Sequence, residues 1–553
     1  MNVKKLLLLF LSLFFFSVCA QESINDEPLS WSLTLQEEVD PLYLEALDLE
    51  EIYEEDRIND RDKSQPYRYG ISRPVVISIH HDGVWSSLEN GGKIWRAAIT
   101  SPGAKNLSAV LSKFHLPKGA TLHFYNTEHT DRTITFSKLQ NRDNDKLATW
   151  FVAGETLWVE YYEPANVDAP VQLEIESVVH GYRMDALESI ADMNRGLNDS
   201  GDCNYDVNCP IGDDFDSQKD ILKKAVAMLT LGNGYLCSAV LLNNTNADKT
   251  PFLLTANHCL ENSDPSLWTI RFNWMSPNPV CATGDESADL LTNFTMSGAT
   301  LRSSNSESDF ALVELHSQVP DSWDIVFAGW DNSDLDPLFE VGIHHPNGDI
   351  MKICRDDSGA VKEDANGTQV WLIGGVSVGE GDGWEIGTTE SGSSGSPLFN
   401  ENGKVIGQLY AGQSHCDGLE SNSDYDIYGR LGVSWDFGDT PETRLKDWLD
   451  PLNIGVSELG SLQNILNIPE VSIEGSLEIY PNPVSNTLLV MNNRYPNLTY
   501  QFYNILGQEL HAGSMANTIN TLSVVDLAEG VYFLHLIDGD TDSRITKKIL
   551  VDR

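Results

Sequence analysis

The stretch "ESGSSGSPLF", residues 390–399, places four serines and two glycines ahead of a short apolar run. A segment this rich in Gly and Ser is most often only a flexible turn. A serine hydroxyl becomes a nucleophile when a base lies within hydrogen-bond reach of it. The fold and function therefore depend on whether the rest of the chain supplies such a base.

Two distant stretches supply candidates for the base and its partner. "FLLTANHCL" ends an apolar run at His258, and "SESDFALVEL" starts another directly after Asp309. Taken singly, a histidine beside a cysteine is usually structural, and an aspartate before a strand is usually a turn residue. Their order with the serines, within one cysteine-rich β region, predicts a nucleophile, a general base and a carboxylate that orients the base.

Composition excludes some classes of partner. The 553 residues include 82 Asp and Glu against 36 Lys and Arg, for a formal net charge of -46. So acidic a chain is not expected to bind nucleic acid or an anionic membrane. Its length predicts roughly three or four domains.

The first twenty residues have the pattern of an export signal. Two lysines precede an apolar run from Leu6 to Val18, and Ala20 ends the segment. We assign residues 1–20 to a signal peptide. The run is too short to span a bilayer comfortably, and no other window approaches twenty apolar residues, so no transmembrane segment is expected. The bulky Val18 argues against a lipid anchor on Cys19.

The remaining cysteines mark one domain. All seven lie between Asp202 and Asp417: Cys203, Cys209, Cys237, Cys259, Cys281, Cys354 and Cys416. In an exported chain, this clustering predicts one disulfide-stapled domain with an odd thiol left over.

Changes in composition divide the chain further. Over residues 21–195 we expect an acidic and poorly ordered or loosely helical leader to about residue 65 and an all-β unit after it. Short strands with turn signals over residues 196–465 predict a β sandwich or barrel. A linker at 466–474 then leads to a β-sandwich at 475–553.

These residues carry a family resemblance. "TANHC", "SDFALVEL" and "GSSGSP" resemble the three catalytic blocks of the chymotrypsin-like serine proteases. "SGDCNYDVNCP", "AGWD", "IHHP", "GQLYAG" and "LKDWLDP" resemble the bacterial lysyl endopeptidase branch, over about residues 201–451. The resemblance implies an all-β, chymotrypsin-like double Greek-key β-barrel. We expect no cofactor, and no EF-hand spacing predicts a catalytic metal.

The resemblance also implies the catalytic roles. Ser394 would be the nucleophile, His258 the base and Asp309 the carboxylate that fixes the imidazole tautomer. The backbone N–H groups of Gly392 and Ser394 would form the oxyanion hole. A glycine at 392 would keep a side chain from obstructing the substrate oxygen. Ser393 stands where many relatives carry aspartate, which argues against activation by a salt bridge to the freed N-terminus.

Specificity is expected to depend on an acid downstream of the nucleophile. Thr388, six residues before Ser394, is neutral, so a copy of trypsin is excluded. The resemblance instead implies Asp426, in "SDYDIYGR", as the carboxylate that binds a substrate lysine. Alternatively, Asp426 is one more solvated acid of its loop. Trp371 would line the substrate cleft or belong to the core, and Tyr410 stands where relatives tend to have histidine.

The disulfide pairing follows from the resemblance alone. It implies Cys203 with Cys416, Cys209 with Cys281, and Cys237 with Cys259. Cys354 would remain unpaired, either as a buried apolar filler or as a reactive thiol.

The two flanking domains suggest how the protein is matured and exported. The all-β unit resembles the propeptide of secreted proteases, and we expect it to block the cleft or assist folding until it is removed near Arg195-Gly196. "YPNPVSNTL" and "DLAEGVYFLHL" resemble the sorting domain of the Bacteroidetes type IX secretion route, with a carbohydrate-binding or adhesion sandwich as the alternative. The resemblance implies outer-membrane secretion machinery as a partner and a secreted or cell-surface location.

The resulting hypothesis is a secreted serine endopeptidase that cuts on the carboxyl side of lysine through an acyl-enzyme. Its partners would be protein and peptide substrates with lysine before the cut, and its own propeptide. The alternatives are a protease with arginine or broader preference, or an inactive adhesin on a protease scaffold.

Overall fold

The structure is a computed structural model that describes residues 27–184, 199–287, 290–365, 367–375, 378, 383–463, 477–492, 497–505, 507–515, 517, 519–538 and 544–552. The predicted signal peptide, the linker and the junction at Arg195-Gly196 lie outside the described residues. The chain divides into two compact units, Met1–Gln463 and Asn464–Arg553, and each is described by itself.

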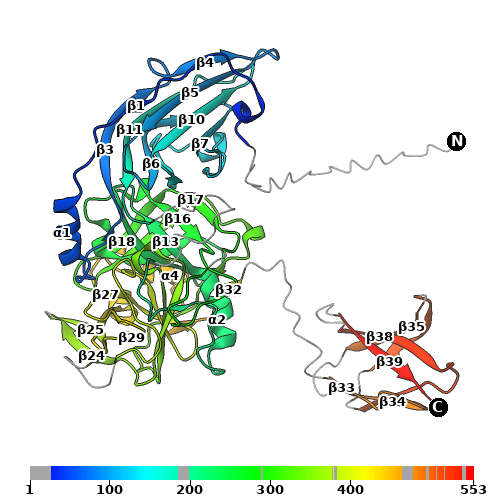
Figure 1. Cartoon of the computed structure of the whole chain (residues 1–553). Helices are drawn as coiled ribbons and strands as arrows, with labels where there is room; N and C mark the ends of the chain where they lie inside the picture. The colour runs from blue at the N-terminus through cyan, green and yellow to red at the C-terminus, as the bar shows by residue number, and fades with distance from the viewer. Residues whose placement is uncertain are drawn as a thin grey trace, which may run out of the picture. The chain divides into compact units, whose positions relative to one another are not determined.

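The first part of the larger unit is a β-sandwich, seen in blue and cyan in Figure 1. One sheet contains β1 (Leu42–Tyr43), β4 (Val84–Ser87), β5 (Lys93–Thr100), β7 (Thr121–Asn126) and β10 (Thr156–Glu163). The other contains β3 (Gly70–Ser78), β6 (Asn106–His115), β8 (Leu147–Ala148), β9 (Val152–Ala153) and β11 (Gln172–Gly181). Leu173 and Ile175 of β11 are buried while Gln172 and Glu176 are exposed, which is the alternation of a strand with one face on a core. This all-β unit, which we call the prodomain below, agrees with the prediction.

The acidic leader is more ordered than predicted. From residue 27 it forms a 3-10 turn (Leu29–Ser32), then β1, which pairs in parallel with β5, and then helix α1 (Glu50–Asn59). The acidic residues of α1 find partners: the buried Asp56 carboxylate contacts Arg68 at 2.7 Å and Arg183 at 2.6 Å. Paired charges of this kind can be buried where unpaired ones cannot, and composition alone does not reveal the partners.

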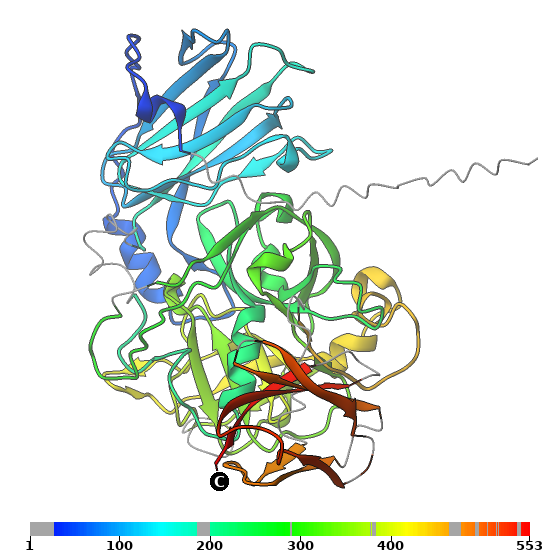
Figure 2. The ribbon, with the colours of Figure 1, turned by 90° about the vertical axis from the view of Figure 1, so that its right-hand side faces the viewer.

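The central part of the larger unit contains two strongly curved sheets (Figure 2). The eight-stranded sheet contains β2 (Tyr67–Arg68), β13 (Val226–Thr230), β14 (Tyr235–Leu242), β15 (Phe252–Ala256), β16 (Thr269–Phe272), β17 (Phe294–Ser297), β18 (Ala299–Asn305) and β19 (Phe310–Leu315). The ten-stranded sheet contains β12 (Tyr205–Asp206), β21 (Trp330–Asp331), β22 (Glu340–His344), β23 (Lys352–Asp356), β24 (Val361–Ala365), β25 (Thr368–Ile373), β26 (Pro397–Asn400), β27 (Val405–Gly412), β30 (Asp426–Arg430) and β31 (Glu458–Leu459). These two sheets agree with the all-β, double-barrel fold that was expected.

Short elements complete the central part. Two two-stranded sheets pair β20 (Val326–Phe327) with β32 (Leu462–Gln463) and β28 (Cys416–Asp417) with β29 (Glu420–Ser421). The helices are α2 (Asp216–Leu222), α3 (Leu431–Asp436) and α4 (Lys446–Leu449).

Two features join the prodomain to the barrel that contains β14. Strand β2 pairs with β14, with Tyr67 opposite Leu236 and Arg68 opposite Tyr235. A buried apolar cluster includes prodomain and barrel side chains: Tyr67, Tyr69, Trp150, Phe151, Ala153, Val179 and Met184 with Met228, Leu236, Trp274 and Ile350. The prodomain is therefore packed directly onto the central part of the larger unit, as Figures 1 and 2 both show.

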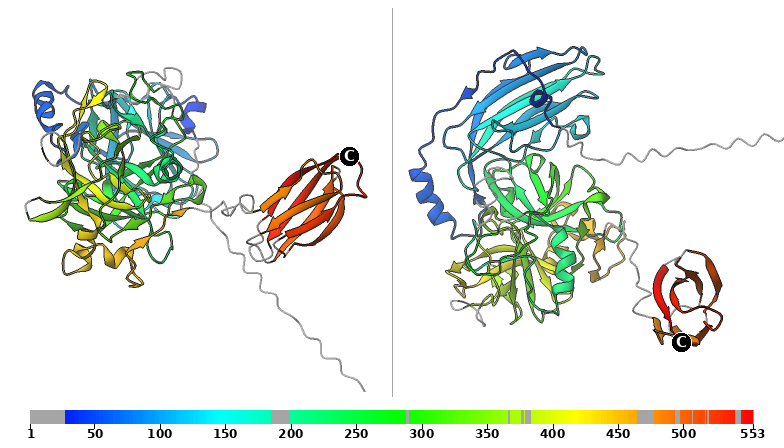
Figure 3. Two further views of the ribbon diagram at one scale, coloured as in Figure 1. Left: turned by 90° about the horizontal axis from the view of Figure 1, so that it is seen from below. Right: turned by 45° about the vertical axis from the view of Figure 1, so that its right-hand side comes forward.

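The smaller unit is a β-sandwich with its own core, drawn in orange and red in Figure 3. One sheet contains β33 (Leu477–Tyr480), β34 (Thr487–Asn492) and β37 (Ile519–Ser523); the other contains β35 (Leu498–Asn504), β36 (Glu509–Ser514), β38 (Gly530–Asp538) and β39 (Arg544–Val551). Leu488 and Val490 are buried at alternate positions, as the period-two pattern predicted.

Candidate active site

Neighbouring strands bring His258 and Asp309 together. Strands β15 and β19 pair antiparallel, with Ala256 opposite Phe310, so the residues that follow one strand and precede the other lie side by side. Nδ1 of His258 lies 2.8 Å from Oδ2 of Asp309, and the backbone N–H of His258 donates to Oδ1 at 2.9 Å. A carboxylate held in this way fixes which imidazole nitrogen carries the proton.

Asp309 is held in an unusual backbone conformation. Its φ is 51°, in the left-handed region that aspartate tolerates better than most residues. Gln408 donates to the backbone carbonyls of Ser308 and Asp309 at 3.0 and 3.2 Å. Burial raises the pKa of the Asp309 carboxyl, while the contacts with His258 act in the opposite direction.

Ser394 lies in a loop that both barrels hold. The backbone N–H of Ser238, in β14, donates to the carbonyl of Ser394 at 2.8 Å, and its hydroxyl donates to the carbonyl of Gly392 at 3.0 Å. From the other barrel, Leu409 accepts from the N–H of Gly395 at 2.9 Å. The nucleophile candidate is thus fixed at the junction of the two barrels.

Among the described residues, no hydrogen bond joins the Ser394 hydroxyl to the His258 imidazole. Its Oγ donates instead to the backbone carbonyl of Lys63, at 3.0 Å. Nε2 of His258 is buried without a hydrogen-bond partner among the described residues. The pair 258 and 309 is therefore in direct contact, whereas the serine is engaged by a segment of the prodomain.

Gly392 adopts a left-handed backbone conformation and has close neighbours. Its φ is +91°, and a Cβ there would lie 3.0 Å from the backbone of His345 and Asn347 and from Leu236. The glycine is therefore required by its backbone conformation and by close neighbours within the protein. The neighbouring Ser393 is buried, and its hydroxyl lies 2.7 Å from Nδ1 of His344.

Asp426 is the floor of a closed polar pocket. Its side chain has no exposure, and Oδ2 accepts hydrogen bonds from Trp384 Nε1 at 2.7 Å, Thr389 Oγ1 at 2.7 Å and Ser414 Oγ at 2.6 Å. Oδ1 lies 2.5 Å from Nζ of Lys63. The alternative of a solvated loop acid is therefore wrong.

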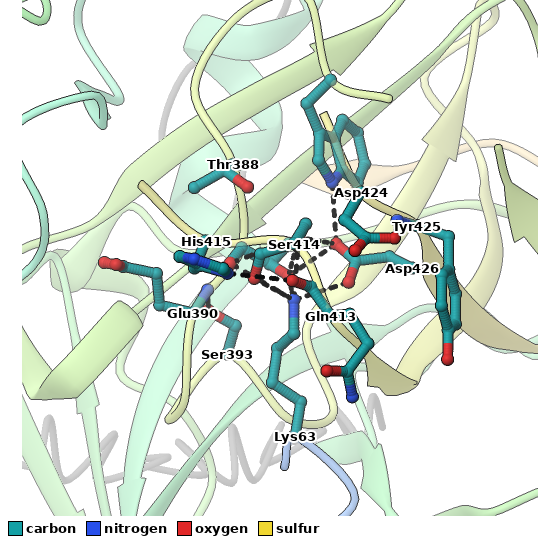
Figure 4. Close-up of polar contacts among 12 residues, drawn as sticks. Lys63, Thr388, Glu390, Ser393, Gln413, Ser414, His415, Asp424, Tyr425 and Asp426 are labelled. Atoms are coloured by element: carbon teal, nitrogen blue, oxygen red, sulfur yellow. Dashed lines mark hydrogen bonds and ion pairs between the residues drawn. The ribbon is translucent and has the colours of Figure 1, made fainter. Parts of the chain in front are cut away.

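Lys63 fills this pocket, as Figure 4 shows. Besides Asp426, its ammonium donates to Oγ1 of Thr389 at 2.7 Å and to the carbonyl and hydroxyl oxygens of Ser414, both at 2.8 Å. The Lys63 side chain is only 2% exposed. A carboxylate partner and several oxygen acceptors offset part of the hydration that a buried lysine ammonium loses.

The expectation that Trp371 lines the substrate cleft is not supported. Trp371 is buried in a core cluster with Cys354, Trp384 and Tyr428, and its indole N–H donates to the carbonyl of Ile406 at 3.1 Å. The tryptophan that touches the pocket carboxylate is Trp384. Strand pairing explains the difference, because Trp371 is opposite Tyr428 on β30, two residues beyond Asp426.

Tyr410 lies near Asp309. It stands at an irregularity between Leu409 and Ala411 in the pairing of β27 with β30, and its side chain is partly buried. Burial, with a smaller contribution from the negative charge of Asp309, raises the pKa of its phenol. Tyr410 is thus close enough to Asp309 for the carboxylate charge to act on its phenol.

Three disulfides staple the protease domain. They join Cys203 to Cys416, Cys209 to Cys281 and Cys237 to Cys259, the same pairs that the resemblance implied. Cys354 is free and buried, and burial raises its thiol pKa well above the usual value. Cys237, His258 and Cys259 cluster closely enough to suggest a metal site, but the two sulfurs are bonded to each other and cannot act as thiolate ligands.

Sequence reasoning missed four residues of the pocket: Lys63, Trp384, Thr389 and Ser414. The last three have no distinguishing motif. Lys63 had one available signal, since it is the only lysine between residues 6 and 92, within a strongly acidic stretch.

The family comparisons cover three regions of the chain. The lysyl endopeptidase N-terminal domain matches residues 43–182, and the lysyl endopeptidase C-terminal domain matches residues 197–429. A secretion system C-terminal sorting domain matches residues 478–552. Such a sorting domain implies that the protein is secreted or held at the cell surface. In the described part of the chain, no helix has the length and apolar character needed to cross a membrane.

Individual proteins give a similar picture. A lysyl endopeptidase of Pseudomonas aeruginosa is 27% identical over 349 residues, covering 60% of this chain and 71% of its own. PorZ, a surface component of the type IX secretion system of Porphyromonas gingivalis, aligns at 9% identity and a TM-score of 0.14 over 57% of this chain and 33% of its own. A domain of a biofilm-associated protein aligns at 10% identity and a TM-score of 0.13, over 88% and 82%. Neither structural likeness bears on the fold, and this chain spans only a third of PorZ. Together, the two matched lysyl endopeptidase domains and the sorting-domain match identify the chain as a serine endopeptidase of the lysyl endopeptidase family with a C-terminal sorting domain.

Proposed function

We propose that this secreted protease hydrolyses peptide bonds on the carboxyl side of lysine, with Ser394 as nucleophile, His258 as base and Asp309 as the orienting carboxylate. The observation that carries the proposal is the lysine side chain in the Asp426 pocket, with its own carbonyl 3.0 Å from Oγ of Ser394. A substrate lysine bound in the same way would present its carbonyl to the nucleophile.

The proposed reaction proceeds through an ester on Ser394. Oγ attacks the substrate carbonyl carbon while Nε2 of His258 takes the hydroxyl proton. The carbon–nitrogen bond then breaks, and His258 returns this proton to the leaving amine. Water attacks the ester by the same route and regenerates the serine. Asp309 stabilises the imidazolium that forms twice in this cycle.

The backbone N–H groups of Gly392 and Ser394 are proposed to bind the oxyanion. The supporting observation is the rigid loop: Ser238 holds the carbonyl oxygens of both residues, and Gly395 is bonded to Leu409. Donors fixed in advance need no rearrangement when negative charge develops, which is why such sites lower the barrier.

The pocket favours lysine over arginine for a geometric reason. Its acceptors come from three residues, Thr389, Ser414 and Asp426, and converge on the single nitrogen of Lys63. An ammonium is a compact charge whose donors can turn toward such a cluster. A guanidinium is planar and bulkier, with five N–H donors in a fixed fork, and would have to displace the Thr389 and Ser414 oxygens.

The hydroxyl groups of Thr389 and Ser414 strengthen this preference. Each donates its one proton to Oδ2 of Asp426 and accepts from the lysine ammonium. An uncharged substrate side chain would leave Asp426 buried without a cation, which is strongly unfavourable.

A panel of fluorogenic peptides that differ only at the residue before the cut tests the proposal. We expect cleavage after lysine, much weaker cleavage after arginine, and almost none after glutamine or norleucine. Equal rates for lysine and arginine would refute the specificity. A fluorophosphonate probe should label Ser394 of the mature enzyme, with Ser394→Ala as control; an unlabelled protein would indicate the adhesin alternative.

The proposed partners follow from the matched domains. They are protein and peptide substrates with an accessible lysine, the protein's own prodomain, and the outer-membrane machinery that reads the sorting domain. The apolar cluster between prodomain and protease supports the second of these.

A further inference from the structure

The chain segment between α1 and β2 crosses the candidate active site. Lys63 is the fourth residue after the end of α1. Its side chain occupies the Asp426 pocket, and its carbonyl accepts a hydrogen bond from Oγ of Ser394. The carbonyl of Gln65 also lies 3.5 Å from Oγ of Ser394. Ser394 is fully buried in this structure.

The direction of this segment is that of a substrate. After Lys63, the chain joins the barrel of His258: β2 pairs with β14, and the N–H groups of Tyr69 and Gly70 donate to the carbonyl of Gly234. Strand β14 contains Cys237, whose disulfide partner Cys259 follows His258 in the chain. The half of the peptide that would leave as an amine therefore lies on the barrel that carries the proton donor, as the reaction requires.

The Lys63 side chain reaches the other barrel. Asp426 begins β30, and Ser414 follows β27, both of the ten-stranded sheet. The segment thus spans the junction between the barrels, with the Lys63–Ser64 bond directly at the nucleophile. No other lysine among the described residues contacts Asp426 or Ser394 in this structure.

The prodomain holds the segment on both sides. Upstream, Asp56 and Asp60 of the α1 region pair with Arg183, and Tyr182 donates to Asp56 at 2.6 Å. Downstream, Arg68 pairs with Asp56 at 2.7 Å. These contacts fix the two ends of the short Lys63 loop to each other, so its position over Ser394 is built into the prodomain.

We propose that Lys63–Ser64 is the first peptide bond that this protein cuts in its own chain, an inference that rests on the proposed function. In the uncut chain the serine proton is shared with the Lys63 carbonyl, and His258 Nε2 is free to receive it once the hydroxyl turns. Oγ then bonds to the Lys63 carbonyl carbon, the bond to the Ser64 nitrogen breaks, and His258 protonates that nitrogen. Water hydrolyses the ester, which leaves a carboxylate on Lys63 and restores the Ser394 hydroxyl.

The two pieces would remain together after the cut. The upstream piece keeps the pairing of β1 with β5 and the ion pairs of Asp56. The new Lys63 carboxylate end would still occupy the pocket and act as a competing product. Activity toward other substrates is therefore expected to appear later than the cut itself.

The test is a time course of the full-length chain, sampled under denaturing conditions and analysed by N-terminal sequencing and intact mass. We expect a fragment that begins Ser64-Gln65-Pro66 in the wild type and none in Ser394→Ala. Lys63→Gln should slow this cut by about a hundredfold or more, as expected for loss of a buried ion-pair partner. The matched control is Lys113→Gln, an exposed prodomain lysine, which should leave the cut unchanged.

Two further measurements keep the result interpretable if Lys63→Gln does not fold. Ser64→Pro keeps Lys63 but removes the amide N–H at the bond, so it should block the cut even if Lys63→Gln folds poorly. Folded Ser394→Ala precursor mixed with mature wild-type enzyme should resist cutting at Lys63, while the urea-unfolded form should be cut, because the folded chain covers its own bond.

Three outcomes would overturn the inference: no Ser64 end at any time, an unchanged cut in Lys63→Gln, or rapid cutting of the folded Ser394→Ala chain at this bond. The proposed function is checked separately with enzyme matured by immobilised trypsin. If that enzyme cleaves lysyl peptides while the Lys63–Ser64 bond stays intact in the time course of the untreated full-length chain, only the inference fails. If it cleaves none, the proposed function fails as well.

Discussion

Replacing Asp426 by asparagine removes the pocket charge while keeping the shape of the side chain. In the structure this carboxylate is unexposed and 2.5 Å from a lysine ammonium. Removing one partner of a buried ion pair typically costs about 3–5 kcal/mol, because the remaining charge is left uncompensated. We therefore expect kcat/KM for lysyl substrates to fall roughly a hundred- to several-thousand-fold.

The same change should act in the opposite direction on an uncharged substrate. Norleucine resembles lysine without the ammonium, so in the wild type it leaves Asp426 unpaired. With asparagine at 426 that penalty disappears, and we expect lysine and norleucine peptides to be cut within about tenfold of each other.

The assay compares three proteins matured identically with immobilised trypsin: wild type, Asp426→Asn and Asp417→Asn. Asp417 is an exposed acid of the neighbouring β28, so its replacement controls for the loss of one negative charge. Fluorophosphonate titration gives the concentration of active sites in each preparation. A lysyl kcat/KM that stays within about threefold of wild type, or an equal loss for lysine and norleucine, would refute the pocket assignment.

Three further predictions concern stability and export. Burial lowers the pKa of His180 in the prodomain to about 4. Because the imidazole binds more protons in the unfolded state, the free energy of unfolding should fall by up to about 3 kcal/mol as the pH drops from 7 to 4. Urea unfolding of the Ser394→Ala precursor measures this dependence, and adding His180→Gln should flatten it. Cys237→Ala with Cys259→Ala opens a loop of 22 residues and should lower the free energy of unfolding by about 3 kcal/mol, whereas an unchanged urea midpoint would contradict the role of the disulfide. Deleting the residues beyond about 470 should leave the protein in the periplasm by cell fractionation, and normal export would refute the sorting role.

Much of the site could be predicted because its parts are encoded by short local patterns. "TANHC" and "SDFALVEL" each join a polar residue to an apolar strand, and antiparallel pairing of two such strands places His258 beside Asp309. The glycines of "GSSGSP" permit the positive φ values that the nucleophile loop adopts at Gly392 and Gly395. Seven clustered cysteines indicated one disulfide-stapled domain, because cysteines of an exported protein reach an oxidising compartment and form disulfides there.

The pocket could be predicted only in part. Asp426 was recognised through the resemblance, but Thr389, Ser414 and Trp384 reach its carboxylate from three separate segments. Hydroxyl and indole groups are common in β proteins, so nothing in the local sequence separates these from ordinary core residues. Trp371 shows the converse, because its place in the motif suggested the cleft and its strand register put it in the core.

The amino-acid sequence by itself determined the all-β class and the single stapled domain, because alternation, turn chemistry and cysteine content are local properties. The resemblance of its motifs to a known family supplied the predicted division into domains and the predicted base and nucleophile. Only the tertiary structure decided that Lys63 occupies the Asp426 pocket across 363 positions of chain. That contact requires α1, β2 and the two barrels to lie together in the folded protein. Only then are the charges of Lys63 and Asp426 close enough for their burial to be favourable.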